Sequence, residues 1–354
     1  MKGSKESASE LVTEIRSICS QPWTLMEVCG GQTHALLRHG IDQLLDGKVR
    51  LVHGPGCPVC VTAIERIDEA LELASNRDVI LCSYGDMLRV PGSDGRDLLS
   101  LRRGGADIRI IYTPLDVMRL AEENPKRRVI FFAVGFETTA PATAILVQQT
   151  MVAGFENLQV LMAHVRVGPV LDQLLAEPSC AVNGLIAAGH VCTVMGEGEL
   201  WELAKNYQRP VVITGFEAEE LLEGILECVQ QLEQGRYQLA NAYPRAVRRN
   251  GNQMAQKQIK RVMEPVDTIW RGLGNIPVGG YRLRYPFDRL AVESRAEENK
   301  VANKGECPSA LVLQGLLRPS QCEYYGSRCT PDAPMGAPMV SGEGACAAYY
   351  RYQR

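Results

Sequence analysis

Four cysteines near the C-terminus of this 354-residue chain are the residues best suited to chemistry. They lie on a segment rich in Gly and Pro that has almost no hydrophobic periodicity: Cys307, Cys322, Cys329 and Cys346. Thiolates from separate loops can converge on an iron–sulfur cluster, whose cysteine ligands tolerate irregular spacing. A structural zinc site usually needs two close pairs of ligands, which this segment lacks. We therefore expect a cluster here, with zinc or a purely structural role as the alternatives.

A second thiol motif, Cys57-Pro58-Val59-Cys60, lies far upstream in a Gly-rich turn between a predicted strand and a predicted helix. Two cysteines separated by two residues can close a disulfide, and the first normally has a lowered pKa at a helix N-terminus. Half of a zinc site is the alternative, but no second pair of cysteines lies nearby. The motif favours a redox-active dithiol.

A single cysteine, Cys29, follows the preceding predicted strand. The next residues are Gly30, Gly31, Gln32, Thr33 and His34. Paired glycines let a ligand or another backbone approach closely. The amides of Gly30, Gly31 and Gln32 would favour negative charge on anything that the sulfur binds, and Thr33 and His34 could add hydrogen bonds. An ordinary buried thiol is the alternative interpretation.

Alternating strands and helices must position these thiols. The predicted strands are residues 23–28, 49–54, 78–83, 108–113, 127–134, 158–165, 183–189 and 210–215. Helical stretches lie between them, and the helix predicted over 62–75 has Ile64, Ile67 and Leu71 on one face. Near-continuous apolar strands that alternate with helices predict parallel sheets covered on both faces. Cys29 and Cys57 would then lie at the carboxyl edge of a sheet, where open α/β folds build their sites.

The character of the chain changes near residue 231. A polar, basic stretch follows, which we expect to be helical after Pro244, and residues 272–287 contain Gly and Pro too densely for regular structure. The predicted fold class is α/β, with two Rossmann-like parallel-sheet domains and a smaller C-terminal iron–sulfur domain. The expected division is a leader or helix over 1–22, α/β domains over 23–124 and 125–232, and the cluster domain over 233–354.

Composition narrows the classes of function. A net charge of −3 implies neither a nucleic-acid partner nor an acidic membrane surface. The N-terminus lacks an apolar signal segment, and no apolar run approaches the roughly 20 residues of a membrane span. We therefore expect a cytoplasmic protein, in which cysteines bind metals or react rather than form structural disulfides. Five others fall in apolar or helical surroundings and are expected to be core residues: Cys19, Cys82, Cys180, Cys192 and Cys228.

Other motifs are informative by their absence. The chain has neither a Walker-type phosphate loop nor a G-x-G-x-x-G dinucleotide fingerprint after its first strand, which argues against nucleotide-driven chemistry. Among the histidines, His53 and His190 follow strands and could face a cleft.

Four motifs that span most of the chain resemble the HypD family of hydrogenase maturation factors. They are CGGQTHA (29–35), HGPGCPVC (53–60), GFETTAP (135–141) and MVSGEGACAAYY (339–350). The resemblance implies a scaffold on which the Fe(CN)2CO unit of [NiFe]-hydrogenase is assembled together with a small HypC-type chaperone. A HypE-type cyanide donor, working with HypF, and the hydrogenase large subunit are the other implied partners.

The resemblance also implies roles for residues in this sequence. Cys29 would hold the transient Fe(CN)2CO iron jointly with a cysteine of the chaperone, and Cys57 and Cys60 would be the redox dithiol beside it. The four C-terminal cysteines would hold a [4Fe–4S] cluster. The residues implied to line or support the central cleft are Gly135, Phe136, Glu137, Thr138, Thr139, His190 and Glu343.

Two other classes stay open. An iron–sulfur dithiol/disulfide reductase would use the cluster and the Cys57/Cys60 motif alone, and the residues without the resemblance rank it first. A plain binding module would have inert thiols and a structural metal. The resemblance places the maturation scaffold ahead of both.

Overall fold

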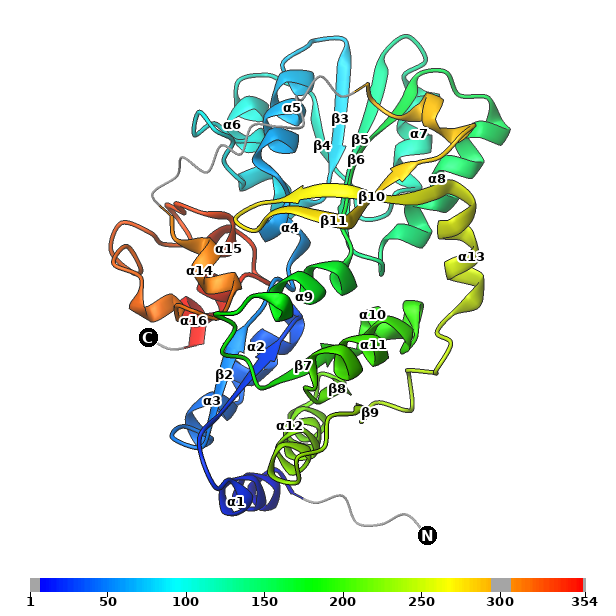
Figure 1. Ribbon diagram of the computed structural model, residues 1–354. Helices are drawn as coiled ribbons and strands as arrows, with labels where there is room; N and C mark the ends of the chain where they lie inside the picture. Colours follow the sequence, from blue (N-terminus) through cyan, green and yellow to red (C-terminus); the bar gives the residue numbers. More distant parts are fainter. Residues whose placement is uncertain (1–6, 294–306, 353–354) are drawn as a thin grey trace.

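The computed structural model describes residues 7–293 and 307–352. Two parallel sheets form two lobes, a long β-hairpin crosses between them, and the C-terminal segment lies beside both (Figure 1). The α/β class with two parallel sheets, predicted from the sequence, is confirmed. Among the described residues, no helix has the length and apolar character needed to cross a bilayer.

The first sheet has the strand order β2-β1-β7-β8-β9, all parallel. Its strands are β1 Trp23–Glu27, β2 Val49–His53, β7 Gly184–Ala188, β8 Val211–Thr214 and β9 Leu239–Asn241. Strand β9 was not predicted, because its three residues lie in the polar stretch after residue 231. Helix α1, Ala8–Ile18, covers this sheet together with α12, Ala218–Glu233, and their apolar side chains share one core.

The second sheet has the order β4-β3-β5-β6, again parallel. Its strands are β3 Val79–Ser83, β4 Ile108–Ile110, β5 Arg128–Gly135 and β6 Leu158–His164. Seven successive residues of β5 are buried, as expected for a strand covered on both faces.

The chain passes from one sheet to the other and back. Strand β1 pairs with β2 and β7, and neither β1 nor β2 pairs with β3, so the expected boundary between 124 and 125 falls within the second sheet. The sheets therefore do not follow the expected domain division. Pairing depends on which strands the crossover helices bring side by side, and sequence order alone does not determine that.

Helices join and cover the strands. Their bounds are α2 Gly30–Arg38, α3 Ile41–Leu44, α4 Pro58–Val61, α5 Ile64–Ala74, α6 Leu98–Arg103, α7 Asp116–Glu123, α8 Ala140–Ala153, α9 Val167–Ala176, α10 Gly189–Met195 and α11 Gly198–Tyr207, with a 3-10 turn η1 at Gly85–Arg89. The helix predicted after Cys29 is interrupted at Gly40, whose φ of 64° breaks the α-helical path. The helix predicted from Thr62 is preceded by the separate turn α4, which holds the Cys57/Cys60 motif.

The segment expected to be irregular, residues 272–287, instead contributes β11, Gly274–Leu283, which pairs antiparallel with β10, Met263–Trp270. The glycines make the hairpin possible, since Gly272 and Gly274 adopt φ values of 81° and 79° in its turn. The helix expected after Pro244 begins later, as α13 Gln253–Val262. Backbone bonds from Arg166 to Gly279 and from Arg271 to Val61 fasten the hairpin to both lobes.

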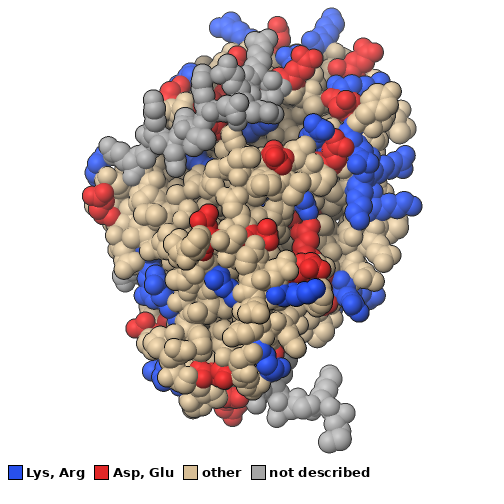
Figure 2. Space-filling model, in the orientation of Figure 1, with Lys and Arg blue, Asp and Glu red and all other residues tan. Residues whose placement is uncertain are grey.

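The remaining chain is short helices and turns: η2 Phe287–Leu290, α14 Ser309–Leu313, η3 Pro319–Gln321, α15 Ala337–Val340 and α16 Ala345–Tyr352. Charges of both signs are interspersed over much of the visible surface, with lysines and arginines gathered near α13 (Figure 2).

Trp270 is fully buried against Phe136, with ring centroids 6.0 Å apart, and its indole N–H donates to the Gly279 carbonyl at 3.0 Å. We expect Trp270→Ala to lower the free energy of unfolding by about 3–5 kcal/mol, because it leaves a cavity and an unpaired carbonyl. The control is Trp201→Ala, since Trp201 is 51% exposed and its loss should cost less than about 1 kcal/mol. Urea denaturation followed by circular dichroism measures both; equal losses would contradict this role for the hairpin.

Candidate functional site

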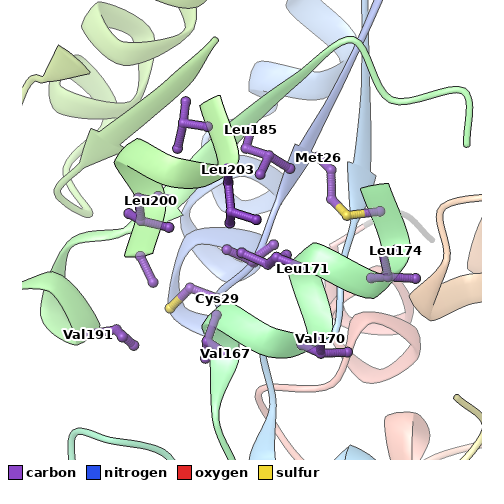
Figure 3. Close-up of a cluster of buried hydrophobic side chains, with 14 of the residues drawn as sticks. Met26, Cys29, Val167, Val170, Leu171, Leu174, Leu185, Val191, Leu200 and Leu203 are labelled. Carbon is purple, nitrogen blue, oxygen red and sulfur yellow. The ribbon is translucent and has the colours of Figure 1, made fainter. Parts of the chain in front are cut away.

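Cys29 caps the N-terminus of α2 directly after β1, and its thiol is buried among apolar side chains of α9 and α10 (Figure 3). Burial raises the pKa of the thiol to about 12, and the carboxyls of Glu27 and Glu343 act in the same direction. Hydrogen bonds from the amides of Gln32 and Gly31 oppose that shift. Two of the three expected amides thus approach the sulfur, whereas Gly30 N–H donates to the Gly56 carbonyl at 3.2 Å. The thiol therefore keeps its proton until something cationic replaces it.

His190 lies beside this thiol. Its Nδ1 is 3.6 Å from Cys29 Sγ, and Phe216 packs against its other side with ring centroids 5.4 Å apart. Burial lowers the pKa of His190, so the ring is neutral at physiological pH. A neutral imidazole next to a protonated thiol carries no positive charge. The site therefore does not repel a cation that displaces the thiol proton.

Two glycines allow three segments to meet at Cys29. A Cβ at Gly56 would overlap the backbone of Val28 and Cys29, and one at Gly30 would overlap Glu343. Gly30 and Gly56 therefore serve close packing of the protein's own backbone. They bring the C-terminal segment against the Cys29 loop.

The next three side chains bond to protein groups. Gln32 donates to the Ala187 carbonyl at 3.1 Å and to Thr214 Oγ1 at 2.7 Å, at the carboxyl ends of β7 and β8. The Thr33 hydroxyl donates to Glu27. His34 contacts the Gly342 carbonyl and, at 3.2 Å, the Tyr352 hydroxyl. In the part of the chain that the structure describes, none of these side chains is hydrogen-bonded to the sulfur, so they shape the loop rather than the ligand side of Cys29.

Cys57 and Cys60 form a disulfide at the N-terminus of α4, with Cα atoms 5.3 Å apart. Both are buried, and Cys60 N–H donates to Cys57 Sγ at 3.3 Å. The pair that the sequence singled out as a redox couple is thus in its oxidised form, and α15 covers it from the C-terminal segment, with Ala337 O 3.8 Å from Cys60 Sγ.

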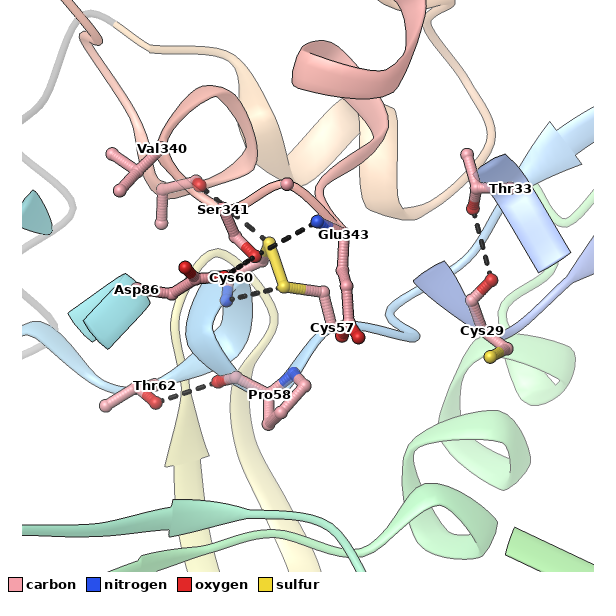
Figure 4. Close-up of a disulfide and its surroundings, with 12 residues drawn as sticks. Cys29, Thr33, Cys57, Pro58, Cys60, Thr62, Asp86, Val340, Ser341 and Glu343 are labelled. Atoms are coloured by element: carbon pink, nitrogen blue, oxygen red, sulfur yellow. Dashed lines mark hydrogen bonds between the residues drawn. A yellow bond between two sulfur atoms is a disulfide. The ribbon is translucent and has the colours of Figure 1, made fainter. Parts of the chain in front are cut away.

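Polar groups of α15's neighbours surround the disulfide (Figure 4). Ser341 donates to Asp86 at 3.2 Å and accepts the Glu343 N–H at 3.2 Å. The side chain of Glu343 points toward the space between Cys57 and Cys29, and burial raises its pKa. Sequence reasoning missed Asp86, because a single aspartate in a 3-10 turn carries no recognisable signal.

The GFETT segment lies on another side of the Cys29 loop. Phe136 packs on Trp270, Thr139 donates to the Phe136 carbonyl at 3.2 Å, and Gly135 leaves room for the Thr139 hydroxyl. One oxygen of the fully buried Glu137 accepts the Val167 N–H at 3.0 Å, while the other has no partner among the described residues. Thr138 is half-buried. Glu137 lines a cavity of about 290 Å³, whose wall includes Val28 beside Cys29.

The four C-terminal cysteines line one small cavity. Burial and the other three thiols raise the pKa of Cys346. The Met335 N–H donates to Cys329 Sγ at 3.4 Å. Burial raises the pKa of Cys307, and a hydrogen bond from the Ser309 N–H opposes that shift. A Cβ at Gly336 would overlap Cys307 Sγ, so the glycine keeps the cavity open.

This donor set fits a cluster better than a single ion. Within residues 7–293 and 307–352, no three His, Cys, Asp or Glu side chains are grouped closely enough to hold one metal ion. Four thiols from separate turns line one cavity of about 20 Å³, and cysteine thiolates of this kind are the ligands of iron–sulfur clusters. Pro338 and Met339 line this cavity, and their neighbours Ala337 and Val340 pack against the disulfide. Helix α15 therefore separates the two thiol sites by only its own thickness.

Among the cysteines expected in the core, Cys19, Cys82, Cys192 and Cys228 are buried. Cys180 is only half-buried and lies 3.1 Å from Arg209 Nη1.

Fold and site together define an α/β protein with a buried single thiol, an adjacent disulfide and a four-cysteine cavity. The family model described as "HypD: Hydrogenase formation hypA family" matches residues 6–353. The chain therefore belongs to the HypD family and is a hydrogenase maturation factor.

Curated relatives align with this chain over nearly its full length. The hydrogenase maturation factor HypD2 of Bradyrhizobium diazoefficiens is 41% identical over 99% of this chain and 95% of its own. HypD of Escherichia coli K12 is 41% identical over 99% of this chain and 94% of its own, and HypD of Azotobacter vinelandii is 44% identical over 94% and 90%.

Glu137 should make the stability of the fold depend on pH. Burial raises its pKa from an ordinary 4.5 to about 7. Below about pH 4.5 the carboxyl is protonated in both states and burial carries no penalty. As the pH rises toward 7, the unfolded chain releases this proton while the folded protein retains it, so stability falls; above 7 the penalty is constant.

Glu137→Gln removes this titration. The free energy of unfolding of the variant, relative to the wild type, should rise by about 3 kcal/mol between pH 4.5 and 8. Urea denaturation across this range measures the difference, with the exposed Glu72→Gln as the control. A difference that does not change with pH would contradict the raised pKa.

Proposed function

We propose that this maturation factor is the scaffold on which the Fe(CN)2CO unit of [NiFe]-hydrogenase is assembled, and that it supplies the electrons for that assembly. The observation that carries the proposal is the Cys29 thiol, buried beside a neutral His190 and approached by the amides of Gly31 and Gln32. Such a thiol stays protonated and is a poor nucleophile, but a metal ion can displace its proton.

Iron(II) that carries cyanide and CO is electron-rich and low-spin, and it suits a thiolate ligand. Cyanide nitrogens are strong acceptors, which the amides at the start of α2 can satisfy. The described residues place no group of three ligands around Cys29 that could hold an ion. In this proposal a cysteine of a HypC-type chaperone supplies a further ligand to the iron.

The Cys57–Cys60 disulfide provides the redox element of the proposal. Its reduction takes up two electrons and two protons and releases two thiols. A [4Fe–4S] cluster, when bound by the four C-terminal cysteines, supplies electrons one at a time. The chain's own contribution is α15, which packs on the cysteine cavity with one side and on the disulfide with the other. This arrangement keeps the two thiol sites close and excludes water between them.

The other partners follow from this role. A HypE-type donor, working with HypF, delivers cyanide, and the hydrogenase large subunit receives the unit through the small chaperone. All of these steps belong to the cytoplasm.

Infrared spectroscopy tests the anchor. The protein, purified anaerobically with its HypC-type partner, should show cyanide and CO stretching bands, and Cys29→Ala should lose them because the iron has no thiolate in this chain. Cys19→Ala is the control, since Cys19 is an equally buried cysteine outside the site. Bands that persist in Cys29→Ala would remove Cys29 as the anchor. Absence of the bands in the wild type, with a brown chromophore present, would favour the dithiol/disulfide reductase, which the buried disulfide also suits.

Iron and acid-labile sulfide analysis tests the cluster. The anaerobic wild type should contain about four of each per chain. Cys322→Ala, Cys329→Ala, Cys346→Ala and Cys307→Ala should each lower this content and bleach the visible absorbance, because each removes one of four ligands. Cys180→Ala should leave both unchanged. One zinc per chain without sulfide would overturn the cluster assignment.

A further inference from the structure

The fully buried carboxylate of Glu27 is hydrogen-bonded to three groups around the Cys29 loop. It accepts the Cys29 N–H at 2.8 Å, the Thr33 hydroxyl and the Nδ1–H of His53, whose nitrogen is 2.6 Å away. These three donors come from the loop itself, from the first turn of α2 and from the end of β2. One side chain thus fixes the backbone of Cys29 relative to the amides that approach its sulfur.

The chain of hydrogen bonds continues beyond His53. Its Nε2 lies 3.1 Å from the Tyr349 hydroxyl, and the two rings meet edge to face with centroids 5.2 Å apart. The imidazole thus faces Glu27 with Nδ1 and the Tyr349 hydroxyl with Nε2, and it links the carboxylate to α16. A buried path of three hydrogen bonds therefore links Tyr349 to the Cys29 N–H, and Glu27 accepts from both His53 and Cys29 along it.

Tyr349 also connects this path to the four-cysteine cavity. It lies on α16 one turn after Cys346, which lines that cavity. A second tyrosine of α16, Tyr352, contacts His34 in the middle of the Cys29 helix α2. Both tyrosines dock α16 on α2 and β2, but only Tyr349 reaches Glu27.

We propose that Tyr349, His53 and Glu27 are positioning residues that make the geometry of Cys29 depend on whether the four-cysteine cavity is filled. A group bound by Cys346 holds α16 in place, and the hydrogen-bond chain transmits that position to the Cys29 N–H. When the cavity is empty, α16 loses one anchor. His53 then loses its Nε2 partner, its hold on Glu27 weakens and the Cys29 loop loosens. The inference rests on the proposed function for what Cys29 and the cavity hold.

The device has a physical rationale. A fully buried carboxylate is stable only while its donors are in place, because an unpaired buried charge is costly. Removal of one donor therefore weakens the hold on the other two. A hydrogen bond is also sensitive to a displacement of less than 1 Å, so a small movement of α16 is enough.

Alkylation of Cys29 by iodoacetamide, followed by mass spectrometry, tests the coupling. In the protein with its four-cysteine cavity filled, Tyr349→Phe should raise the rate of Cys29 alkylation about tenfold. The variant removes only the hydroxyl that is hydrogen-bonded to His53. Tyr352→Phe is the matched control on the same helix and should change the rate less than about twofold. The rate at Cys228, which is fully buried elsewhere, is the internal reference for general loosening.

Chelation of the bound group supplies the second comparison. It should raise the Cys29 rate in the wild type and in Tyr352→Phe, but add little in Tyr349→Phe, where the chain is already broken. Equal rates in the two phenylalanine variants, or a full additional effect of chelation in Tyr349→Phe, would overturn the proposal. A parallel rise at Cys228 would show a general loss of packing and also overturn it.

A second variant keeps the proposal testable if Tyr349→Phe does not fold. His53→Leu interrupts the same chain at its middle and should reproduce the effect of Tyr349→Phe, with circular dichroism to verify the fold of each variant. The alkylation rates do not require the Fe(CN)2CO unit. Failure of the infrared test would therefore leave them interpretable, and failure of the alkylation test would leave Cys29 as a candidate iron anchor without this control.

Discussion

The packing of the C-terminal segment against two loops from the other end of the chain is the contact on which the site depends. Glu343 packs on Gly30 so closely that no other residue fits there, and Ala337 lies against Cys60. Because of this contact, four cysteines that are separated from Cys57 by some 250 residues or more lie one short helix away from it. The two parallel sheets supply the rigid edge against which the segment packs, and the β10–β11 hairpin holds the two lobes together beside it (Figure 1).

Desolvation sets the chemistry of this site. Cys29 is buried with two carboxyl groups nearby, and so its thiol has a pKa near 12 despite the amides that approach it. An isolated thiol at a helix N-terminus is expected to be acidic, and here burial outweighs that effect. The result favours ligand exchange with a cation over nucleophilic attack. The neighbouring disulfide is likewise closed to solvent, which leaves the adjoining protein and bound groups as its redox partners.

Much of the local structure was predictable because it depends on short-range patterns. The strands from Trp23 to Thr214 appear within one residue of their predicted positions, except that the strand predicted over 108–113 ends at Ile110, since continuous apolar runs bounded by glycine or polar residues have few other solutions. The hairpin at 263–283 was missed because its glycines read as breakers, whereas in the structure they form its turn. Asp86 and Tyr349 were missed because their partners Ser341 and His53 are distant in sequence, and Glu27 was missed because its link to α16 depends on His53.

The sequence by itself determined which atoms are available for chemistry: a lone thiol after the first strand, a C-x-x-C turn after the second, and four thiols on a loop-rich tail. Side-chain type and local spacing carry that information. Tertiary structure decided which of these atoms meet. Crossovers placed β1 between β2 and β7, and glycine contacts drew the tail against the Cys29 loop. Burial then reversed the acidity expected of Cys29. Contact and desolvation both arise from packing between distant segments, which is why neither is encoded in any short stretch of the chain.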